Sequence, residues 1–395
     1  VEVVGGNTDR ITANGAVISA SGYGYAQIKL SYTVTGKNYE KTLNVLCIDE
    51  TSAPKTVDSE IWLSALDGTL FTPNGEAANV TEGAAIVAAQ SGAGNIVVSG
   101  GKLTGITVNA NKILQTTITV FDENGKVTVL TNVKAFTKVL TKASDLAVLN
   151  LTAAVSTKGY YIVAKDLTDD PAFTNLHPAY ANSARFDGVF DGNGHTVTFT
   201  VSEHGLFGNT GWDAVIKNVA FKNLTTAAAK DHGDQVVLCN LPYGSFEDVY
   251  LSFADFDSVN RGHRTALFQD PASNSIKMTR VIIDIPDASV DAVDYESGTK
   301  SYYGPISLYG TGSKDFTVTG SVYVIAKFMP MISCGFSGKA YYMYAVNDYK
   351  EGESASTTHK VLNSYRYDSV EEMKADTTNY DATGFTATVW QNAGV

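Results

Sequence analysis

Three histidines in the second half of the chain have a spacing that could bring them together in a repeating fold. His204, His232 and His263 lie 28 and 31 residues apart, close to one coil of a solenoid built from stacked units. Four charged residues flank them, namely Asp231, Asp234, Arg261 and Arg264. Such a corner could bind a sugar or a carboxylate, or titrate near neutral pH. The alternative is a solvated corner in which the spacing is fortuitous.

A second group of reactive side chains is confined to one short stretch. Asp187, Asp191, Asn193 and His195 could form an acid/base or metal cluster. However, residues 191–194 have the sequence Asp-Gly-Asn-Gly. Gly and Asn accept the left-handed backbone, and Asp caps its own turn. We therefore interpret this stretch as a tight turn.

An acidic turn is the one candidate for metal binding. Asp166, Asp169 and Asp170 could hold calcium through their carboxylate oxygens. The turn lacks the glycine and the terminal bidentate glutamate of a dedicated calcium loop. We therefore predict no cofactor and no metal site, and calcium is the weaker alternative.

The late part of the chain is rich in tyrosine. Tyr302 and Tyr303 are candidate ligand contacts, because exposed tyrosines offer rigid, amphipathic surface for sugars or proteins. Further tyrosines follow at 309, 341, 342 and 344. The alternative is that half of these side chains pack in the core.

Motifs for catalysis are absent from the sequence. It contains no Gly-x-Ser-x-Gly elbow, no glycine-rich phosphate loop and no His-Glu-x-x-His, so the corresponding hydrolase, nucleotide and zinc-protease functions have no support. A polysaccharide-cleaving enzyme would need paired carboxylates, or an aspartate cluster with a basic residue, on one outer sheet. The sequence alone does not place residues there, and we predict no catalytic residue.

The composition limits both fold and partners. The chain has 395 residues, only 9 prolines and 18% charged residues, which favours several all-β domains. Its net charge of -12 argues against nucleic acid as a partner. No apolar run reaches the roughly 18 residues of a membrane span. Cys47, Cys239 and Cys334 have neither disulfide nor zinc spacing and are expected to be free thiols.

The first 50 residues predict a small antiparallel sandwich. Strand-like runs at 9–11, 15–20, 26–32 and 39–48 are separated by turns such as Asn14-Gly15 and Thr35-Gly36. The order of these runs resembles a bacterial immunoglobulin-like domain of group two. The first strand of such a module is missing from the runs, so we expect the module to be truncated at its start.

Residues 51–140 predict a second immunoglobulin-like sandwich. Strand-like runs include 61–63, 96–98, 103–108, 116–121 and 126–135. The sequence Asp-Glu-Asn-Gly at 122–125 predicts a hairpin between the last two runs, because Asn-Gly accepts positive φ at low cost.

Residues 141–395 contain an internal repeat of roughly thirty residues. One kind of apolar run recurs at 205–208, 236–239, 266–268, 305–308 and 331–334; a second kind recurs at 216–221, 246–251, 278–283, 318–325 and 340–346. Short strands at a fixed period predict a parallel β-helix, in which each coil is buried by its neighbours. Short helices from Ser144 and from Ser369 are expected to cap its ends.

One stretch of this region has a specific resemblance. Phe-Asp-Gly-Val-Phe-Asp-Gly-Asn-Gly-His at 186–195, Gly-Leu-Phe-Gly at 205–208 and Ile-Lys-Asn-Val at 216–219 resemble the opening coils of surface β-helix proteins of gut Bacteroides-type bacteria and their phages. The resemblance covers residues 144–224. It implies a right-handed parallel β-helix, extracellular display on a bacterial cell or a virion, and adhesion or virion structure.

These observations lead to three hypotheses. The first is a non-enzymatic, surface-displayed structural or adhesion protein that presents a β-helix to a surface glycan or to a host or virion protein. The second is a β-helix polysaccharide lyase or glycoside hydrolase. The third is a homo-oligomeric virion component, because β-helices often trimerise.

Overall fold

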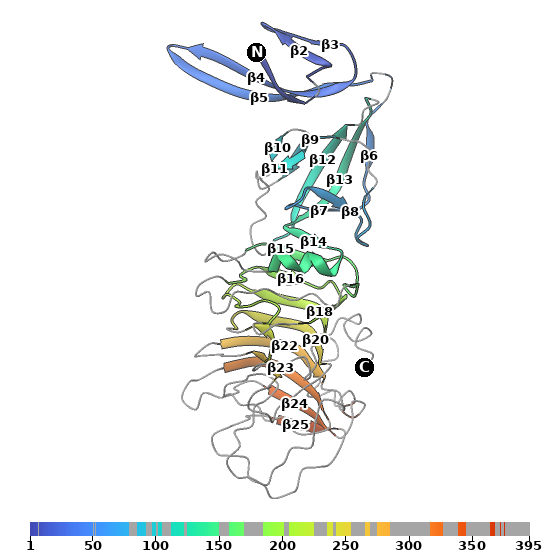
Figure 1. The fold of residues 1–395 in the computed structure, drawn as a ribbon, viewed down its shortest axis with the longest axis vertical. Coiled ribbons are helices and arrows are strands. Elements are labelled where there is room, and N and C mark those ends of the chain that lie inside the picture. Colours follow the sequence, from blue (N-terminus) through green and yellow to red (C-terminus); the bar gives the residue numbers. More distant parts are fainter. Residues whose placement is uncertain are drawn as a thin grey trace, which may run out of the picture. The chain divides into compact units, whose positions relative to one another are not determined.

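The computed structural model divides the chain into two compact units, which we call unit 1 (Val1–Val139) and unit 2 (Leu140–Val395) (Figure 1). The structure describes residues 1–6, 8–49, 51, 53–78, 85–91, 97–99, 102–104, 112–121, 125–149, 158–169, 185–200, 205–224, 235–239, 242–253, 265–268, 275–284, 317–326, 339–344, 364–367, 372 and 375. Within these ranges, no helix has the length and apolar character that a membrane crossing requires.

The described residues form 25 strands and one short helix, so the all-β prediction is confirmed for them. The elements are β1 (Glu2–Gly6), β2 (Ile11–Asn14), β3 (Val17–Ala20), β4 (Gly24–Val34), β5 (Lys37–Cys47), β6 (Lys55–Val57), β7 (Ile61–Ser64), β8 (Thr69–Phe71), β9 (Ala85–Ser91), β10 (Val97–Ser99), β11 (Lys102–Thr104), β12 (Leu114–Phe121), β13 (Val127–Phe136), β14 (Lys138–Leu140), the 3-10 helix η1 (Ala143–Leu149), β15 (Tyr160–Val163), β16 (Val189–Asp191), β17 (Thr196–Phe199), β18 (Val215–Asn223), β19 (Gln235–Cys239), β20 (Ser245–Phe253), β21 (Thr265–Phe268), β22 (Ser275–Asp284), β23 (Thr317–Ala326), β24 (Lys339–Tyr344) and β25 (Ser364–Tyr367).

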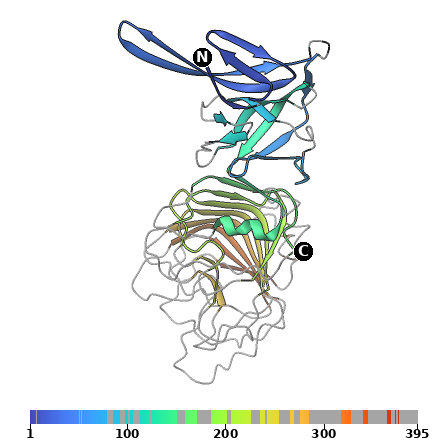
Figure 2. The same cartoon turned by 45° about the horizontal axis from the view of Figure 1, so that its top comes forward.

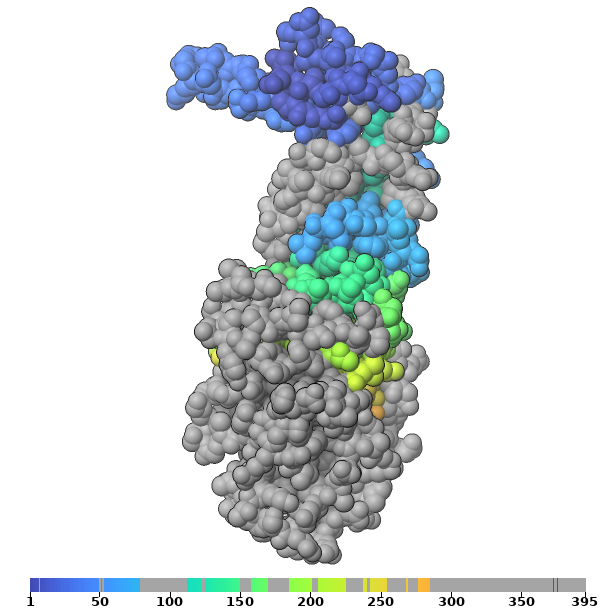
Figure 3. All heavy atoms as spheres, viewed as in Figure 1, coloured from blue at the N-terminus to red at the C-terminus, as the bar shows by residue number. Residues whose placement is uncertain are grey.

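Unit 1 begins with a three-stranded antiparallel sheet in the order β1-β4-β5 and a separate hairpin, β2-β3. Its small core contains Ile11, Ala26 and Ile28. The hairpin β4-β5 is paired along its whole length and turns at Thr35 and Gly36, both with positive φ. Its outer end extends past the other strands of this sheet (Figure 3), where side chains on both faces are exposed.

The remainder of unit 1 contains a mixed sheet in the order β8-β7-β13-β12-β9, with β6 also paired to β13. Strands β12 and β13 are antiparallel, and Gly125 between them has φ 79°, which agrees with the predicted hairpin. The inward positions of the alternating pattern form a core with Leu63, Ile118, Leu130 and Val133.

Unit 2 contains a long stack of strands. Ten strands join in the order β14-β15-β16-β18-β20-β22-β23-β24-β25, with β17 also paired to β18. Each neighbouring pair from β15 to β25 is parallel. Figure 2 shows these strands lying one behind the other. The second predicted set of apolar runs therefore lies on β18, β20, β22, β23 and β24 of this stack, with residues 345–346 outside the described residues.

A second, shorter parallel stack lies across the core from the first. Strands β19 and β21 are parallel, and the backbone N–H groups of Leu206 and Phe207 donate to the carbonyls of Val237 (3.0 Å) and Leu238 (2.8 Å). This stack corresponds to the first predicted set of runs, although residues 205–208 form bends rather than a strand. The predicted runs at 305–308 and 331–334 lie outside the described residues.

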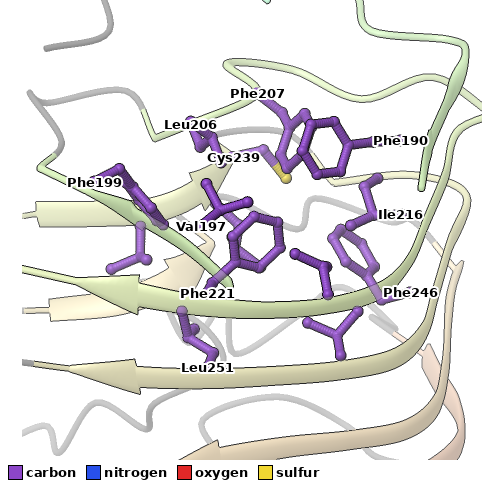
Figure 4. Close-up of a cluster of buried hydrophobic side chains, with 14 of the residues drawn as sticks. Phe190, Val197, Phe199, Leu206, Phe207, Ile216, Phe221, Cys239, Phe246 and Leu251 are labelled. Carbon is purple, nitrogen blue, oxygen red and sulfur yellow. The ribbon is translucent and has the colours of Figure 1, made fainter. Parts of the chain in front are cut away.

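Both stacks share one core. In register, Phe190, Ile216, Phe246 and Met278 form one inward column. Val197, Phe221, Leu251 and Ile283 form another. Leu206, Phe207 and Cys239 meet these columns from the opposite side (Figure 4).

The beginning of unit 2 is covered as predicted. Helix η1 directs Leu146 and Leu149 into the core, and the Asp145 carboxylate accepts hydrogen bonds from the backbone of Thr141 (2.9 Å) and Lys142 (3.2 Å). Of the second predicted capping helix, Glu372 lies within the described residues and is helical.

The cysteines within the described residues are free. Cys239 is buried, and burial raises the pKa of its thiol. Cys47 is half-buried, and Cys334 lies outside the described residues. A buried thiol of this kind is unreactive, because the thiolate is the nucleophile.

Candidate functional site

The nine residues predicted to contact a ligand lie outside the described residues. They are His204, His232, His263, Asp231, Asp234, Arg261, Arg264, Tyr302 and Tyr303. The stacking of the three histidines therefore stays a prediction. The described part of unit 2 nevertheless contains two polar networks and an exposed aromatic group, which are the groups considered for catalysis or ligand binding below.

The Asp-Gly-Asn-Gly stretch is a tight turn, as the sequence predicts. Asn193 and Gly194 have φ values of 51° and 82°, and the Asn193 N–H donates to the Asp191 carboxylate at 2.9 Å. The short side chain of asparagine makes this left-handed conformation tolerable. The turn joins β16 to β17, and both strands pair with the longer strand β18. We call each such level of the stack a rung.

Asp191 has a second role that the sequence did not indicate. Its side chain links the strands on either side of β16. Its carboxylate accepts hydrogen bonds from the Tyr160 hydroxyl (2.6 Å) and the Asn218 side-chain amide (3.2 Å). Lys217 Nζ lies 3.3 Å away and neutralises its charge. Burial, reinforced by the adjacent Asp191 carboxylate, raises the pKa of Tyr160. The network is thus saturated by protein groups.

A second network joins Asp248 of β20 to Arg280 of β22. The positions just before Asn218, Asp248 and Arg280 are in register, and these three residues all have φ between 52° and 55°. The Arg280 guanidinium donates two hydrogen bonds to the Asp248 carboxylate, with Nη2 2.9 Å from Oδ2. Both side chains are mostly buried, so the pair neutralises a charge that would otherwise be costly. These residues form a column of left-handed positions, in which the Arg280 side chain is tied to Asp248.

The other candidate residues of the 187–195 stretch are not brought together into one site. The Asp187 carboxylate accepts from the Asp213 N–H (2.9 Å) and lies 3.6 Å from Lys158 Nζ. His195 Nδ1 lies 3.3 Å from the Asp166 carboxylate instead. The acid/base cluster considered from the sequence is therefore wrong for these residues.

The acidic turn shows no calcium-type arrangement. Asp166 accepts from the Thr196 N–H (2.9 Å) and Asp169 from the Ala143 N–H (2.9 Å), so the two carboxylates serve different backbone groups. Asp170 lies outside the described residues. Over the described ranges, no group of three or more His, Cys, Asp or Glu side chains could hold a metal ion.

One carboxylate of unit 2 should make stability depend on pH. Burial raises the pKa of Asp284, against the opposing effect of the Tyr250 hydroxyl, which donates to it at 2.6 Å. The folded state therefore holds this proton more tightly than the unfolded state. From the ordinary aspartate pKa of about 3.9 up to the raised folded value, the free energy of unfolding falls as pH rises.

We expect Asp284→Asn to remove this contribution, because asparagine does not titrate and its side-chain oxygen still accepts from Tyr250. The free energy of unfolding of unit 2, measured in urea from pH 3.5 to 7, should fall less steeply in the variant. Asp213→Asn, a change at an exposed site, is the matched control and should keep the wild-type slope. Equal slopes for wild type and Asp284→Asn would contradict the prediction.

The described part of unit 2 also has an exposed aromatic group, which was not predicted. Trp212 is 66% exposed. Its ring centroid lies 4.5 Å from that of Tyr243 in an edge-to-face arrangement, and Arg185 Cζ lies 4.4 Å from the Tyr243 centroid. The three residues come from the turns that precede β18, β20 and β16. We call them the aromatic platform.

Comparison with known proteins gives no relative for this chain: no family model, no curated protein and no solved structure matches it.

Proposed function

We propose that this chain is a non-enzymatic, surface-displayed structural or adhesion protein that presents a right-handed parallel β-helix for binding to a glycan or a protein. We place it outside the cell, on a bacterial surface or a virion. In this proposal residues 1–50 and 51–140 are immunoglobulin-like sandwiches that act as spacers, and residues 141–395 form the presenting body.

The observation that carries the proposal is the pair of parallel stacks around one core. In a β-helix, successive coils place equivalent residues in columns, and each coil is buried by its neighbours. The columns that begin at Phe190 and Val197 have this property. Such a body is extended and rigid, which suits the display of a binding surface better than it suits a mobile catalytic cleft.

The polar networks support binding over catalysis. A glycoside hydrolase needs one carboxyl group poised to donate a proton and a second poised to attack or to activate water. Asp191 and Asp248 are instead committed to Lys217 and Arg280, with further hydrogen bonds from neighbouring rungs. These carboxylates stabilise the stack and have no capacity left for substrate.

Support for the spacer role comes from unit 1. Its described strands form a three-stranded antiparallel sheet, two two-stranded antiparallel sheets and a mixed sheet around small cores, and its described residues include no helix. Small β domains of this kind are common as rigid spacers, and their function rests in sites rather than in the fold.

The proposal can be tested by a glycan array combined with a depolymerisation assay on the same glycans, using the full chain. We expect binding to a restricted set of glycans with no release of reducing ends and no unsaturated uronate product. Cleavage of any bound glycan would overturn the non-enzymatic assignment in favour of a lyase or hydrolase. Light scattering of the same sample would separate a monomer from the homo-oligomer that a virion component would form.

A further inference from the structure

We infer that the aromatic platform of Trp212, Tyr243 and Arg185 binds the face of a neutral pyranose ring in a glycan. This inference rests on the proposed function and names a site and a ligand class for it. The platform combines an exposed aromatic ring, free polar groups and a fixed backbone.

The exposure of Trp212 is the first reason. In the described part of the chain, no large apolar side chain is more exposed than this one, at 66%. An indole in water loses the burial that would normally stabilise it. Exposed aromatic rings that are held in place are typical of recognition surfaces.

The platform is also held rigidly. Thr210 Oγ1 donates to the Tyr243 carbonyl (2.9 Å) and accepts from the Tyr243 N–H (2.8 Å), so the two turns are tied together. The Gly211 N–H donates to the Phe186 carbonyl at 2.7 Å. A Cβ at Gly211 would lie 2.2 Å from the Asp187 carboxylate, so a larger residue there would displace the Asp187 side chain. A preformed site avoids much of the entropy cost of binding.

The polar groups around the ring are suited to hydroxyl groups. The described residues offer no ion-pair partner to Arg185 and no hydrogen-bond partner to the Trp212 indole N–H, so both can donate. Asp213 is exposed next to Trp212 and can accept. A pyranose has an apolar C–H face for the indole and a rim of hydroxyls for these donors and acceptors.

Charge and size distinguish the sugar from other ligands. Lys158 and Asp187 pair with each other, and Arg185 and Asp213 have opposite charges, so the local charges cancel. A neutral ring is thus expected in preference to a uronic or sialic acid. A stable protein interface buries about 800 Å² on each partner, whereas a single indole flanked by charged residues matches one sugar ring.

The test uses the full chain and four variants on neutral and acidic glycans. Trp212→Ala should weaken binding to a neutral glycan about tenfold or more, because an aromatic anchor dominates small interfaces. Trp212→Phe should lie between wild type and alanine, and Arg185→Gln should weaken binding several-fold. Tyr32→Ala is the matched control, because Tyr32 is also an exposed ring stacked on another tyrosine (Tyr39), and it should bind as wild type.

Tryptophan fluorescence gives an independent readout. The chain has three tryptophans: Trp62 is buried, Trp212 is exposed, and Trp390 lies outside the described residues. Glycan bound at the platform should shift the emission of Trp212 to shorter wavelength, and Trp212→Phe should abolish this shift. Circular dichroism of each variant checks that the fold is retained.

The outcomes separate this inference from the proposed function. Glycan binding that is unchanged in Trp212→Ala would overturn the platform and leave the proposed function standing. Trp212-dependent binding restricted to acidic glycans would overturn the choice of a neutral ring. Depolymerisation of a bound glycan would overturn the proposed function, whatever the variants do.

Discussion

Phe221→Ala is expected to destabilise unit 2 by about 3–5 kcal/mol, as large-to-small changes of buried phenylalanines do. The Phe221 side chain is fully buried, and its ring packs against Phe190, Phe199 and Phe207 at centroid distances of 5.8 to 6.2 Å. Alanine would leave a cavity in the middle of an inward column. The loss would affect the rungs above and below as well as β18.

Calorimetry of the full chain would measure this effect as a lower transition temperature of unit 2. Phe221→Leu should cost less than half as much, because leucine refills most of the volume. Leu224→Ala, a change at a 40% exposed position just beyond β18, is the surface control and should stay within about 0.5 kcal/mol of wild type. An alanine variant with the wild-type transition would show that the aromatic column is not the core of unit 2.

Gly244→Ala is the second change expected to have a large effect. Gly244 has φ +78°, and a Cβ there would lie 2.2 Å from the Ala214 carbonyl oxygen on the preceding rung. The left-handed conformation alone costs an alanine about 1–2 kcal/mol. The backbone clash must also be relieved by separating two rungs, so we expect a total of about 3 kcal/mol or more.

Gly36→Ala is the control that isolates the clash. Gly36 has nearly the same φ, +77°, but nothing lies within 4 Å of its added Cβ. Gly36→Ala should therefore lower the free energy of unfolding of unit 1 only by the cost of the left-handed conformation, about 1–2 kcal/mol. Equal losses at the two glycines, each measured in urea against its own unit, would refute a tight contact between rungs at Gly244.

Much of the stacking in unit 2 could be predicted from the sequence. The apolar run at 216–221 recurs from residues 246, 278, 318 and 340, at spacings of 30, 32, 40 and 22 residues. Neighbours in a parallel stack need similar side chains in similar order. Strand β25 escaped prediction because its Ser-Tyr-Arg-Tyr sequence has little apolar character. Residues 205–208 are bends because Gly205 and Gly208 take positive φ.

The functional surface was harder to predict. The Asp191 network depends on which rungs are adjacent, and a single pattern of Asp, Gly and Asn indicates only the local turn. The aromatic platform was missed because its members are far apart in the sequence. The same period of about thirty residues that drew attention to the histidines also relates Arg185, Trp212 and Tyr243.

The outer half of the hairpin β4-β5 has a practical consequence for protein engineering. Its strands pair from Gly24 with Cys47 to Val34 with Lys37, while the buried residues of β4 are confined to the inner end. Inserted residues at Thr35-Gly36 would lengthen the loop without displacing the core, and exposed loop tips tolerate such insertions. This turn is therefore a suitable position for an epitope tag or a fluorescent label.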